Sequence, residues 1–429
     1  MKTIVTSLAA GCLLAVVAIA QPPRYKVSDL GLQGATGGPF VLRDNGLISG
    51  SAPISNGTVH AAFWYKGKGP IDLGKPGLGG PNSIAFAVNE EGQFVGAAET
   101  STGDDEDFCA FKASGLSPGK VCRPFFWQNG MMTPLPTLGG KNGEATTINS
   151  RGEAAGLAET NTRDPNPACP VKQFKPVIWQ NGNIRQLHTS GIDSHKVMFN
   201  DPNGFVYGIN DKGQVAGASG DCSPSTTPNG TYLQPLHALL WESDGTVLDL
   251  GNLGGTGHGT GTWAVSINND GQVVGSSDLK GDQNAHAFRW TKETGMSDLG
   301  TLPGDEQSGG IWINDRGDVV GVSISFDEGF NPRAFLLQKG ATMMTDLNTR
   351  IPANSPFYLL FAVGIDSHEA IIATAFDSID NQVHSVLLTP IERATFGDSP
   401  DPAVQGVTLP VLPEEVRKMV LRRFGIRAR

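Results

Sequence analysis

The chain has 429 residues, of which 56 are glycine, 28 are proline and only 17% are charged, and its formal net charge is −10 at pH 7. Abundant glycine and proline are typical of an all-β protein with many tight turns and argue against a helical enzyme. A negative surface repels phosphate groups, so we exclude nucleic acid as a partner.

Residues 1–20 predict a signal peptide. Lys2 supplies a positive start, an apolar run follows, and Ala18-Ile19-Ala20 is a small-x-small cleavage site before Gln21. A lipoprotein box at Cys12 is the alternative, but most of the apolar run follows Cys12, which favours cleavage after Ala20. No other stretch is long enough to span a membrane. We therefore expect a secreted protein, extracellular or periplasmic.

Residues 25–390 contain a motif that recurs seven times. Its clearest copy is Ile-Asn-Asn-Asp-Gly-Gln-Val-Val-Gly at 267–275. A period of roughly 40–60 residues is typical of propellers and solenoids. The copies occupy residues 42–50, 88–96, 148–156, 209–217, 267–275, 313–321 and 365–373.

Each copy predicts four short strands, A to D. In the fifth copy we expect them at 263–267, 272–277, 286–290 and 295–299. Strands A and B are joined at Asn268–Gly271 by a tight, bulged hairpin, because Asn tolerates the turn and Gly accepts a positive φ. The strands are rich in Val, Ala, Ile and Gly without clean alternation, which indicates sheets covered on both faces.

The last copy predicts strands at 361–365, 370–375 and 384–388 but lacks strand D. A matching strand stands at the front of the repeat region, where Tyr25–Gly31 resembles Gly295–Gly300. A solenoid has no reason for this offset, whereas a ring closed by its first strand requires it. We therefore predict an all-β, seven-bladed β-propeller in which the N-terminal strand completes the last blade.

A basic or imidazole side chain begins strand C in every copy. Aspartate recurs on strand D, and a hydrogen bond or ion pair between the two strands would fix their register. We expect a structural role for the seven strand C positions: His60, Arg123, Lys175, His237, His286, Arg333 and His384. The recurring aspartates are Asp29, Asp72, Asp249, Asp298 and Asp346. The alternative is a functional ring of cations, which would require all seven to face one cavity.

The repeats resemble the HAF-repeat family of extracellular bacterial proteins, named for its His-Ala-Phe triplet. The resemblance rests on His286–Trp290, Met296–Leu302 and Ile267–Gly275, and it extends over about residues 25–390. It implies export and a repeated β architecture, but no established activity and no catalytic residues. The second and third copies depart from the triplet, with Arg123-Pro-Phe and Lys175-Pro-Val.

Four of the five cysteines remain after cleavage of the leader. An even number in an exported chain predicts two disulfides. Cys109 and Cys122 lie in one insertion and are expected to pair, so that Cys169 and Cys222 would link neighbouring repeats. Zinc binding is the alternative, but the chain has no Cys-x-x-Cys pair and no clustered histidines to support it.

The connections between strands B and C are long in copies 2, 3 and 4 and short in the others. All B–C connections of a propeller emerge on one face, and long, disulfide-braced loops on a rigid scaffold are a common recognition design. The alternative is that these insertions have no function. The candidate ligand-binding residues are Asp104, Asp105, Glu106, Asp107, Lys112, Arg163, Asp164 and Lys172, together with His258 in a D–A loop.

The sequence predicts no cofactor and no metal centre. The four acids at 104–107 allow weak Ca²⁺ binding, but they lack the spaced ligands of a calcium loop. We expect no catalytic residue, because the chain has neither Gly-x-Ser-x-Gly nor His-Glu-x-x-His.

Residues 391–429 predict a linker and a short C-terminal amphipathic helix, near 413–425. Its apolar stripe includes Val416, Met419 and Val420. Docking on the propeller is the expected role, and contact with an anionic membrane or a partner is the alternative.

These features lead to three functional hypotheses. The first is a module that binds a glycan or an extracellular protein through the loops of copies 2–4. The second is an extracellular polysaccharide hydrolase or lyase with paired acids at the channel mouth, about 5–9 Å apart. The third is a structural surface or matrix protein. The absence of a nucleophile motif favours binding over catalysis.

Overall fold

The computed structural model describes most of the repeat region and part of the C-terminal segment. The described residues are 23–32, 40–54, 57–74, 77–106, 108–109, 111, 115–117, 119–223, 233–256, 261–326, 330–391 and 410–423. The predicted signal peptide lies outside them, as does most of the predicted linker.

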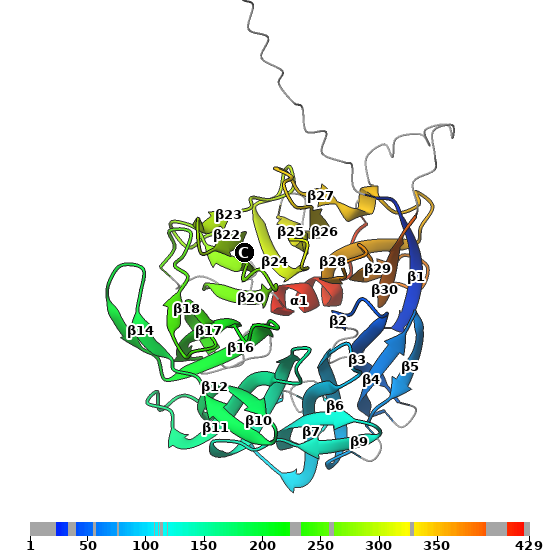
Figure 1. The fold of residues 1–429 in the computed structure, drawn as a ribbon. Coiled ribbons are helices and arrows are strands. Elements are labelled where there is room, and N and C mark those ends of the chain that lie inside the picture. The colour runs from blue at the N-terminus through cyan, green and yellow to red at the C-terminus, as the bar shows by residue number, and fades with distance from the viewer. Residues whose placement is uncertain are drawn as a thin grey trace, which may run out of the picture.

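Within this part of the chain, seven four-stranded antiparallel sheets surround a central axis (Figure 1). The predicted seven-bladed β-propeller is confirmed. Blades 1 to 3 contain β2 (Val41–Leu42), β3 (Leu47–Pro53), β4 (Val59–Tyr65) and β5 (Lys68–Asp72); β6 (Gly79–Val88), β7 (Phe94–Gly103), β8 (Lys120–Gln128) and β9 (Met131–Pro134); β10 (Gly139–Ile148), β11 (Ala154–Arg163), β12 (Lys172–Gln180) and β13 (Asn183–Gln186).

Blades 4 to 7 follow the same plan. They contain β16 (Asn203–Ile209), β17 (Val215–Cys222), β18 (Leu233–Trp241) and β19 (Val247–Asp249); β20 (Trp263–Ile267), β21 (Val273–Asp278), β22 (Ala285–Thr291) and β23 (Gly295–Asp298); β24 (Gln307–Ile313), β25 (Val319–Ser325), β26 (Asn331–Leu337) and β27 (Thr345–Asp346); β28 (Phe357–Ile365), β29 (Ile371–Asp377), β30 (Gln382–Pro390) and β1 (Tyr25–Leu32). A 3-10 turn, η1 (Leu347–Thr349), follows β27. An additional hairpin, β14 (Ser190–Ile192) and β15 (Met198–Asn200), lies between blades 3 and 4.

The ring closes through the N-terminal strand. β1 pairs antiparallel with β30, so that Tyr25 lies opposite Pro390 and Leu32 opposite His384. In Figure 1 the blue β1 runs beside the orange β30. The first and last strands of the propeller therefore share one sheet, as the offset of the sequence repeat predicts.

The last glycine of the motif is required by the hairpin between strands A and B. Strand A shifts its register just after the residue that faces this glycine, for example after Ala85, which pairs with Gly96. A Cβ atom on Gly96 would lie 1.9 Å from the main-chain oxygen of Ile84, and one on Gly275 would lie 1.7 Å from that of Trp263. Because no side chain fits at this approach in these blades, glycine recurs there, whereas blade 7 has Ala373 together with a second register shift in its strand A.

Neighbouring blades pack through apolar clusters and tryptophan hydrogen bonds. Three of the strand C tryptophans donate to main-chain oxygens of the preceding blade: Trp64 to Leu30, Trp179 to Pro136 and Trp241 to His188, at 3.1, 2.8 and 2.7 Å. Each ring thus buries its apolar surface and satisfies its polar atom across a blade boundary.

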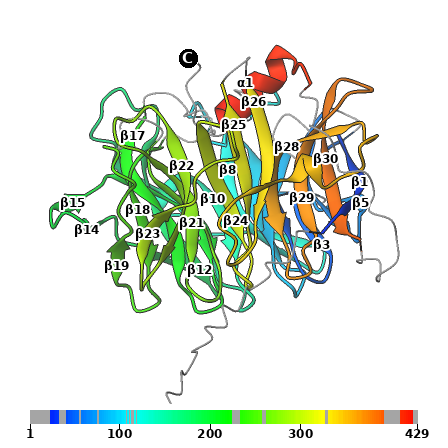
Figure 2. The ribbon, with the colours of Figure 1, turned by 90° about the horizontal axis from the view of Figure 1, so that it is seen from above.

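The C-terminal segment forms the helix α1 (Glu414–Arg423), which lies on one face of the ring (Figure 2). Val416 is 7% exposed and Val420 is 0% exposed, and both pack in a cluster with side chains of blades 1, 6 and 7. The expected docking of this helix on the propeller is therefore observed. Among the described residues, no helix has the length and apolar character needed to cross a membrane.

Candidate functional site

The B–C hairpins of blades 2, 3 and 4 extend the sheets on the face that carries α1. Their last strand pairs are Gly103 with Lys120, Arg163 with Lys172, and Cys222 with Leu233. The ends of β25 and β26 in blade 6 contribute Ile324 and Phe330 to the cluster around α1, which places the B–C ends and the helix on the same face.

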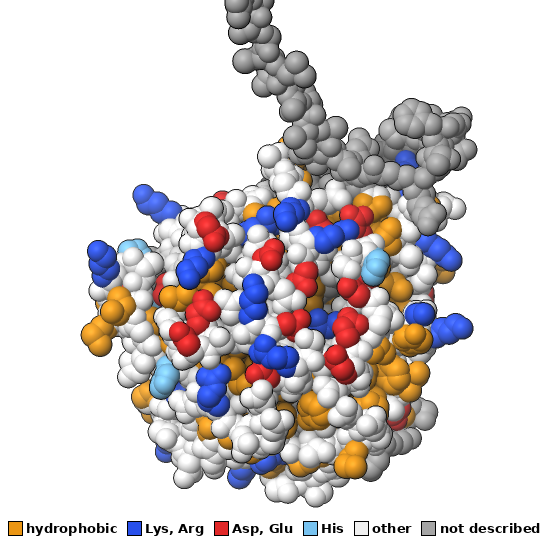
Figure 3. Space-filling view, viewed as in Figure 1, with side chains coloured by type: hydrophobic (Ala, Val, Ile, Leu, Met, Phe, Trp, Pro, Cys, Tyr) orange, Lys and Arg blue, Asp and Glu red, His pale blue; other side chains and the backbone are white. Residues whose placement is uncertain are grey.

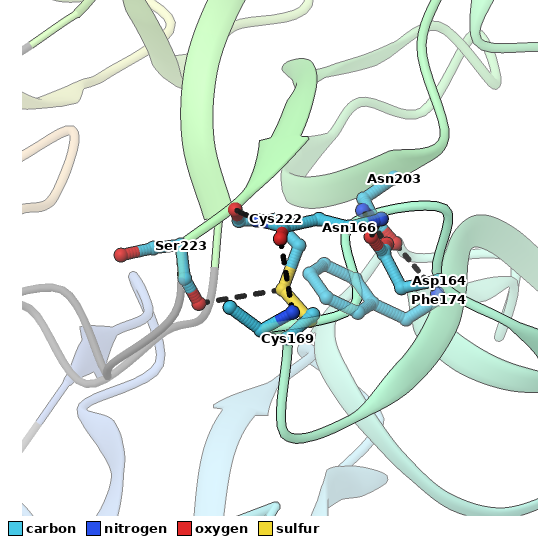
Figure 4. Close-up of a disulfide and its surroundings, with 8 residues drawn as sticks. Asp164, Asn166, Cys169, Phe174, Asn203, Cys222 and Ser223 are labelled. Carbon is cyan, nitrogen blue, oxygen red and sulfur yellow. Dashed lines mark hydrogen bonds between the residues drawn. A yellow bond between two sulfur atoms is a disulfide. The ribbon is translucent and has the colours of Figure 1, made fainter.

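Both predicted disulfides are present in these hairpins. Cys109 is joined to Cys122 within blade 2, and Cys169 in the blade 3 loop is joined to Cys222 at the end of β17 in blade 4. In Figure 4 the second disulfide lies beside Asn166, whose side chain donates to the main-chain oxygen of Cys222 at 3.4 Å. Two neighbouring hairpins are thus covalently tied at their outer ends.

Buried asparagines at the start of strand A fix the hairpins of blades 2 and 3 at their base. The three asparagines are Asn82, Asn142 and Asn203, and their side-chain oxygens accept hydrogen bonds from strand C of the preceding blade at 2.9–3.0 Å. Their side-chain nitrogens donate to buried carboxylates: to Glu99 at 2.7 Å, to Asp104 at 2.9 Å and to Asp164 at 2.8 Å.

Three carboxylates converge at Asn142. Its Nδ2 atom lies 2.9 Å from Asp104 Oδ2, 3.3 Å from Glu106 Oε2 and 3.5 Å from Glu159 Oε2. Glu159 is 0% exposed, and the main-chain nitrogen of Lys141 donates to it at 2.7 Å. The Lys141 ammonium lies 3.5 Å from Asp104 Oδ1 and balances part of this negative charge.

Burial raises the pKa of Glu106 to about 8, and contact with Glu159 and the charge of Asp104 act in the same direction, whereas Lys172 opposes them. The raised pKa favours the protonated form of Glu106 within this group of acids. Carboxyl groups in direct contact are closer than the about 5–9 Å that separates the two acids of a glycoside hydrolase.

The structure assigns different environments to the predicted ligand-binding residues. Asp104 and Asp164 are buried and hydrogen-bonded, Glu106 and Lys172 are half-buried, and Asp105 and Arg163 are exposed. Asp107, Lys112 and His258 lie outside the described residues. Sequence reasoning missed Asn142 and Glu159, although the repeated Ala-Glu-Thr at 98–100 and 158–160 marks the equivalent buried glutamates of two blades.

The recurring basic residues of strand C make local contacts, each at its own place in the ring. Four pair with the aspartate of the adjacent strand D: His60 with Asp72, His286 with Asp298, His384 with Asp29 and Arg333 with Asp346, at 3.0–3.3 Å. Lys175 donates to Thr189 Oγ1 at 3.0 Å, and Arg123 to the main-chain oxygen of Leu135 at 3.1 Å.

His237 departs from this pattern. Its Nδ1 atom lies 2.8 Å from Asp201, and its ring stacks on Phe199 of β15 with 4.1 Å between the ring centroids. Asp249, the aspartate of the adjacent strand D, accepts a hydrogen bond from the main-chain nitrogen of Gly251. The additional hairpin β14–β15 therefore replaces the strand D partner of this histidine.

Comparison with protein-family models and with curated proteins gives no match. Among solved structures, the propeller domain of the Trilobed protease from Pyrococcus furiosus is 10% identical, with a TM-score of 0.44 over 88% of this chain and 100% of that one. An ulvan lyase of a new polysaccharide lyase family is 10% identical, with a TM-score of 0.41 over 83% and 94%. A putative TolB from Agrobacterium tumefaciens is 11% identical, with a TM-score of 0.37 over 64% and 85%. This similarity extends no further than the fold.

Proposed function

We propose that this chain is a secreted or periplasmic binding module whose recognition surface is formed by the B–C hairpins of blades 2, 3 and 4. The observation that carries the proposal is the double fixation of the hairpins of blades 2 and 3, by the two disulfides and by the Asn142 and Asn203 contacts at the base, with Cys222 linking blade 4 to blade 3. A loop ordered before binding loses less conformational entropy when a ligand arrives. Location in an oxidising compartment agrees with the disulfides, and the resemblance to HAF-repeat proteins has the same implication.

The charges of the hairpins favour an acidic glycan as the ligand. Most of the carboxylates there are turned inward and engaged by asparagine, whereas Arg163 at the end of the blade 3 hairpin is exposed and its strand partner Lys172 is half-buried. Outward cations over inward acids suit a polar ligand that carries carboxylate or sulfate groups.

A thermal-shift screen of the oxidised protein with acidic and neutral oligosaccharides tests this function. A ligand that binds only the folded state raises the melting temperature. We expect a shift with acidic oligosaccharides that the double substitution R163A/K172A removes. The matched control is K280A, an exposed lysine in the short B–C turn of blade 5, on the same face. A shift that survives R163A/K172A would place the ligand elsewhere.

The same samples separate the two other hypotheses. A hydrolase or lyase would generate new chain ends from the polysaccharide over time, which a reducing-end assay detects. A protein partner would leave every oligosaccharide without effect but would be retained by the immobilised propeller in an R163A/K172A-sensitive manner. No binding of either kind would favour a structural surface protein.

A further inference from the structure

The two disulfides leave one boundary of the recognition surface without a covalent link. The disulfide between Cys109 and Cys122 stays within the blade 2 hairpin, whereas the one between Cys169 and Cys222 joins the hairpins of blades 3 and 4. The blade 2 hairpin therefore rests on blade 3 through non-covalent contacts. The strength of those contacts decides whether the two hairpins stay together.

Two carboxyl groups meet at this boundary. Glu106 lies in the blade 2 hairpin, and Glu159 lies on β11 of blade 3, where it is 0% exposed. Both contact Asn142, whose Nδ2 atom lies 3.3 Å from Glu106 Oε2 and 3.5 Å from Glu159 Oε2. Burial and direct contact with Glu159 raise the pKa of Glu106. The closed boundary thus brings two acids together in a place that is largely shielded from water.

The two oxygens of Glu159 differ in their partners. Oε2 accepts from the main-chain nitrogens of Lys141 and Asn142 at 2.7 and 3.2 Å. Oε1 is buried, and none of the described residues provides it with a fixed hydrogen-bond donor. Leaving a buried carboxylate oxygen without a donor is costly. A proton on the neighbouring Glu106 would turn that carboxyl into a donor and would remove the repulsion between two charges.

The cations near this pair do not replace such a proton. The Lys141 ammonium lies 3.5 Å from Asp104 Oδ1. Burial and the neighbouring acids raise the pKa of Glu106 more than the charge of Lys172 lowers it. In the described part of the chain, no lysine, arginine or histidine forms an ion pair with Glu159. The shared proton is therefore the positive charge that keeps the two acids in contact.

Charged groups elsewhere in the propeller are arranged differently. Charged side chains of both signs surround the centre of the face opposite α1 (Figure 3), and in an A–B hairpin there Arg316 lies 2.7 Å from Asp318 and 2.9 Å from Glu369. At the boundary of blades 3 and 4, the repeat has the neutral residues Asn166 and Gly220 at the same distances from the last glycine of the motif. Within the recognition surface, the acid pair is thus specific to the boundary of blades 2 and 3.

We propose that Glu106 and Glu159 share one proton that holds the blade 2 hairpin on blade 3, so that the recognition surface opens between these blades as the pH rises. Opening releases the proton to solvent and leaves two carboxylates. The consequence for binding rests on the proposed function: a ligand that spans both hairpins should bind more weakly at alkaline pH. The proton-linked contact itself requires no ligand.

The direction of the pH dependence follows from the two states of Glu106. In the open state its pKa is that of an ordinary carboxyl group, about 4.3. In the closed state its pKa is raised to about 8. Between these two values opening releases a proton, whereas below and above them it releases none. The equilibrium constant for opening should therefore rise about tenfold per pH unit from about pH 5 to about pH 7.5 and level off above that range.

Hydrogen exchange of one amide reports this opening. The main-chain nitrogen of Cys122 donates to Asn142 Oδ1 across the boundary at 2.9 Å. The internal control is Phe174, whose main-chain nitrogen donates to Asn203 at 3.0 Å across the disulfide-linked boundary of blades 3 and 4. With intrinsic exchange rates divided out, we expect the protection of Cys122 to fall about 100-fold from pH 5.5 to pH 7.5 and that of Phe174 to stay constant. Equal pH dependence of the two amides overturns the proposal.

Glu106→Gln distinguishes a shared proton from an ordinary polar contact. The glutamine amide can donate to Glu159 at every pH, and its oxygen can still accept from Asn142, so the protection of Cys122 should no longer depend on pH. The matched control is Asp105→Asn, which removes the charge of an exposed acid in the same hairpin and should keep the pH dependence of the parent. The proposal is also overturned if Glu106→Gln keeps that dependence or if Asp105→Asn loses it. Because no ligand is present, a failure here is distinct from a failure of the binding assays.

Discussion

Replacing His384 by alanine should weaken the closure of the ring. The His384 side chain is 9% exposed, and its Nδ1 atom lies 3.1 Å from Asp29 Oδ1, across the pair of strands that joins the two ends of the propeller. Its Nε2 atom lies 2.9 Å from Asp380 on the loop before β30. The substitution removes the charged side-chain contact between β30 and β1.

The expected loss follows from these environments. A hydrogen bond between charged groups contributes about 1.5–3 kcal/mol when buried. Asp29 is 44% exposed, so solvent screens its interaction with His384. We therefore expect His384→Ala to lower the free energy of unfolding by about 1–2 kcal/mol.

The effect depends on pH in a defined direction. Burial lowers the pKa of His384, but hydrogen bonds and charges of Asp380 and Asp29 outweigh it, and the net pKa is raised. A group whose pKa is raised by folding stabilises the folded state fully below its unfolded pKa, about 6.5, and loses that contribution as pH rises through the folded value. The difference between parent and variant should be largest near pH 5.5 and smallest near pH 9.

Urea unfolding and hydrogen exchange of the β1 amides, each at both pH values, measure this effect. The matched control is His286→Ala, which removes the equivalent 3.0 Å contact to Asp298 between strands that follow each other in the chain. We expect faster β1 exchange in His384→Ala and unchanged β1 exchange in His286→Ala. Equal behaviour of the two variants, or a larger loss at pH 9, would refute this reasoning.

Three further predictions concern the scaffold. Gly96→Ala should lower the free energy of unfolding by at least about 3 kcal/mol or prevent folding, because its Cβ would lie 1.9 Å from a main-chain oxygen. The control is Gly103→Ala, which has no atom within 4 Å of the added Cβ and should fold normally in a thermal melt. Asn210→Ala should lower stability in urea by about 2–4 kcal/mol, since it removes two donated hydrogen bonds at a position 4% exposed. Reduction of the disulfide between Cys169 and Cys222, which are 53 residues apart, should lower the free energy of unfolding by about 4 kcal/mol in the chain-entropy description. An unchanged denaturation midpoint in the presence of reductant would contradict this prediction.

Much of the propeller is predictable because its signal repeats. Blade 5 illustrates this: the first strand is expected at 263–267 and observed at Trp263–Ile267, and the other strands differ by about one residue at their ends. Strand order follows from the offset at Tyr25, since only a closed ring gives that strand a partner. The disulfide pairing followed from the position of Cys109 and Cys122 in one insertion.

The contacts between blades are much less visible in the sequence. Asn142 and Glu159 are ordinary polar residues until the fold brings the Asp104 loop beside them. Likewise, the hairpin β14–β15 is an addition to one D–A connection, without a counterpart in other repeats from which to infer it. The histidine of blade 4 consequently has a different partner, Asp201, from the one that the repeat predicts.

The shared sheet of β1 and β30 also determines when the protein can finish folding. Asp29 and His384 are 355 positions apart, so the N-terminal strand emerges from the ribosome long before its partner is synthesised. Until β30 arrives, blade 7 has no edge partner for β1 and the ring stays open. The propeller therefore cannot close until nearly all of the chain has been made.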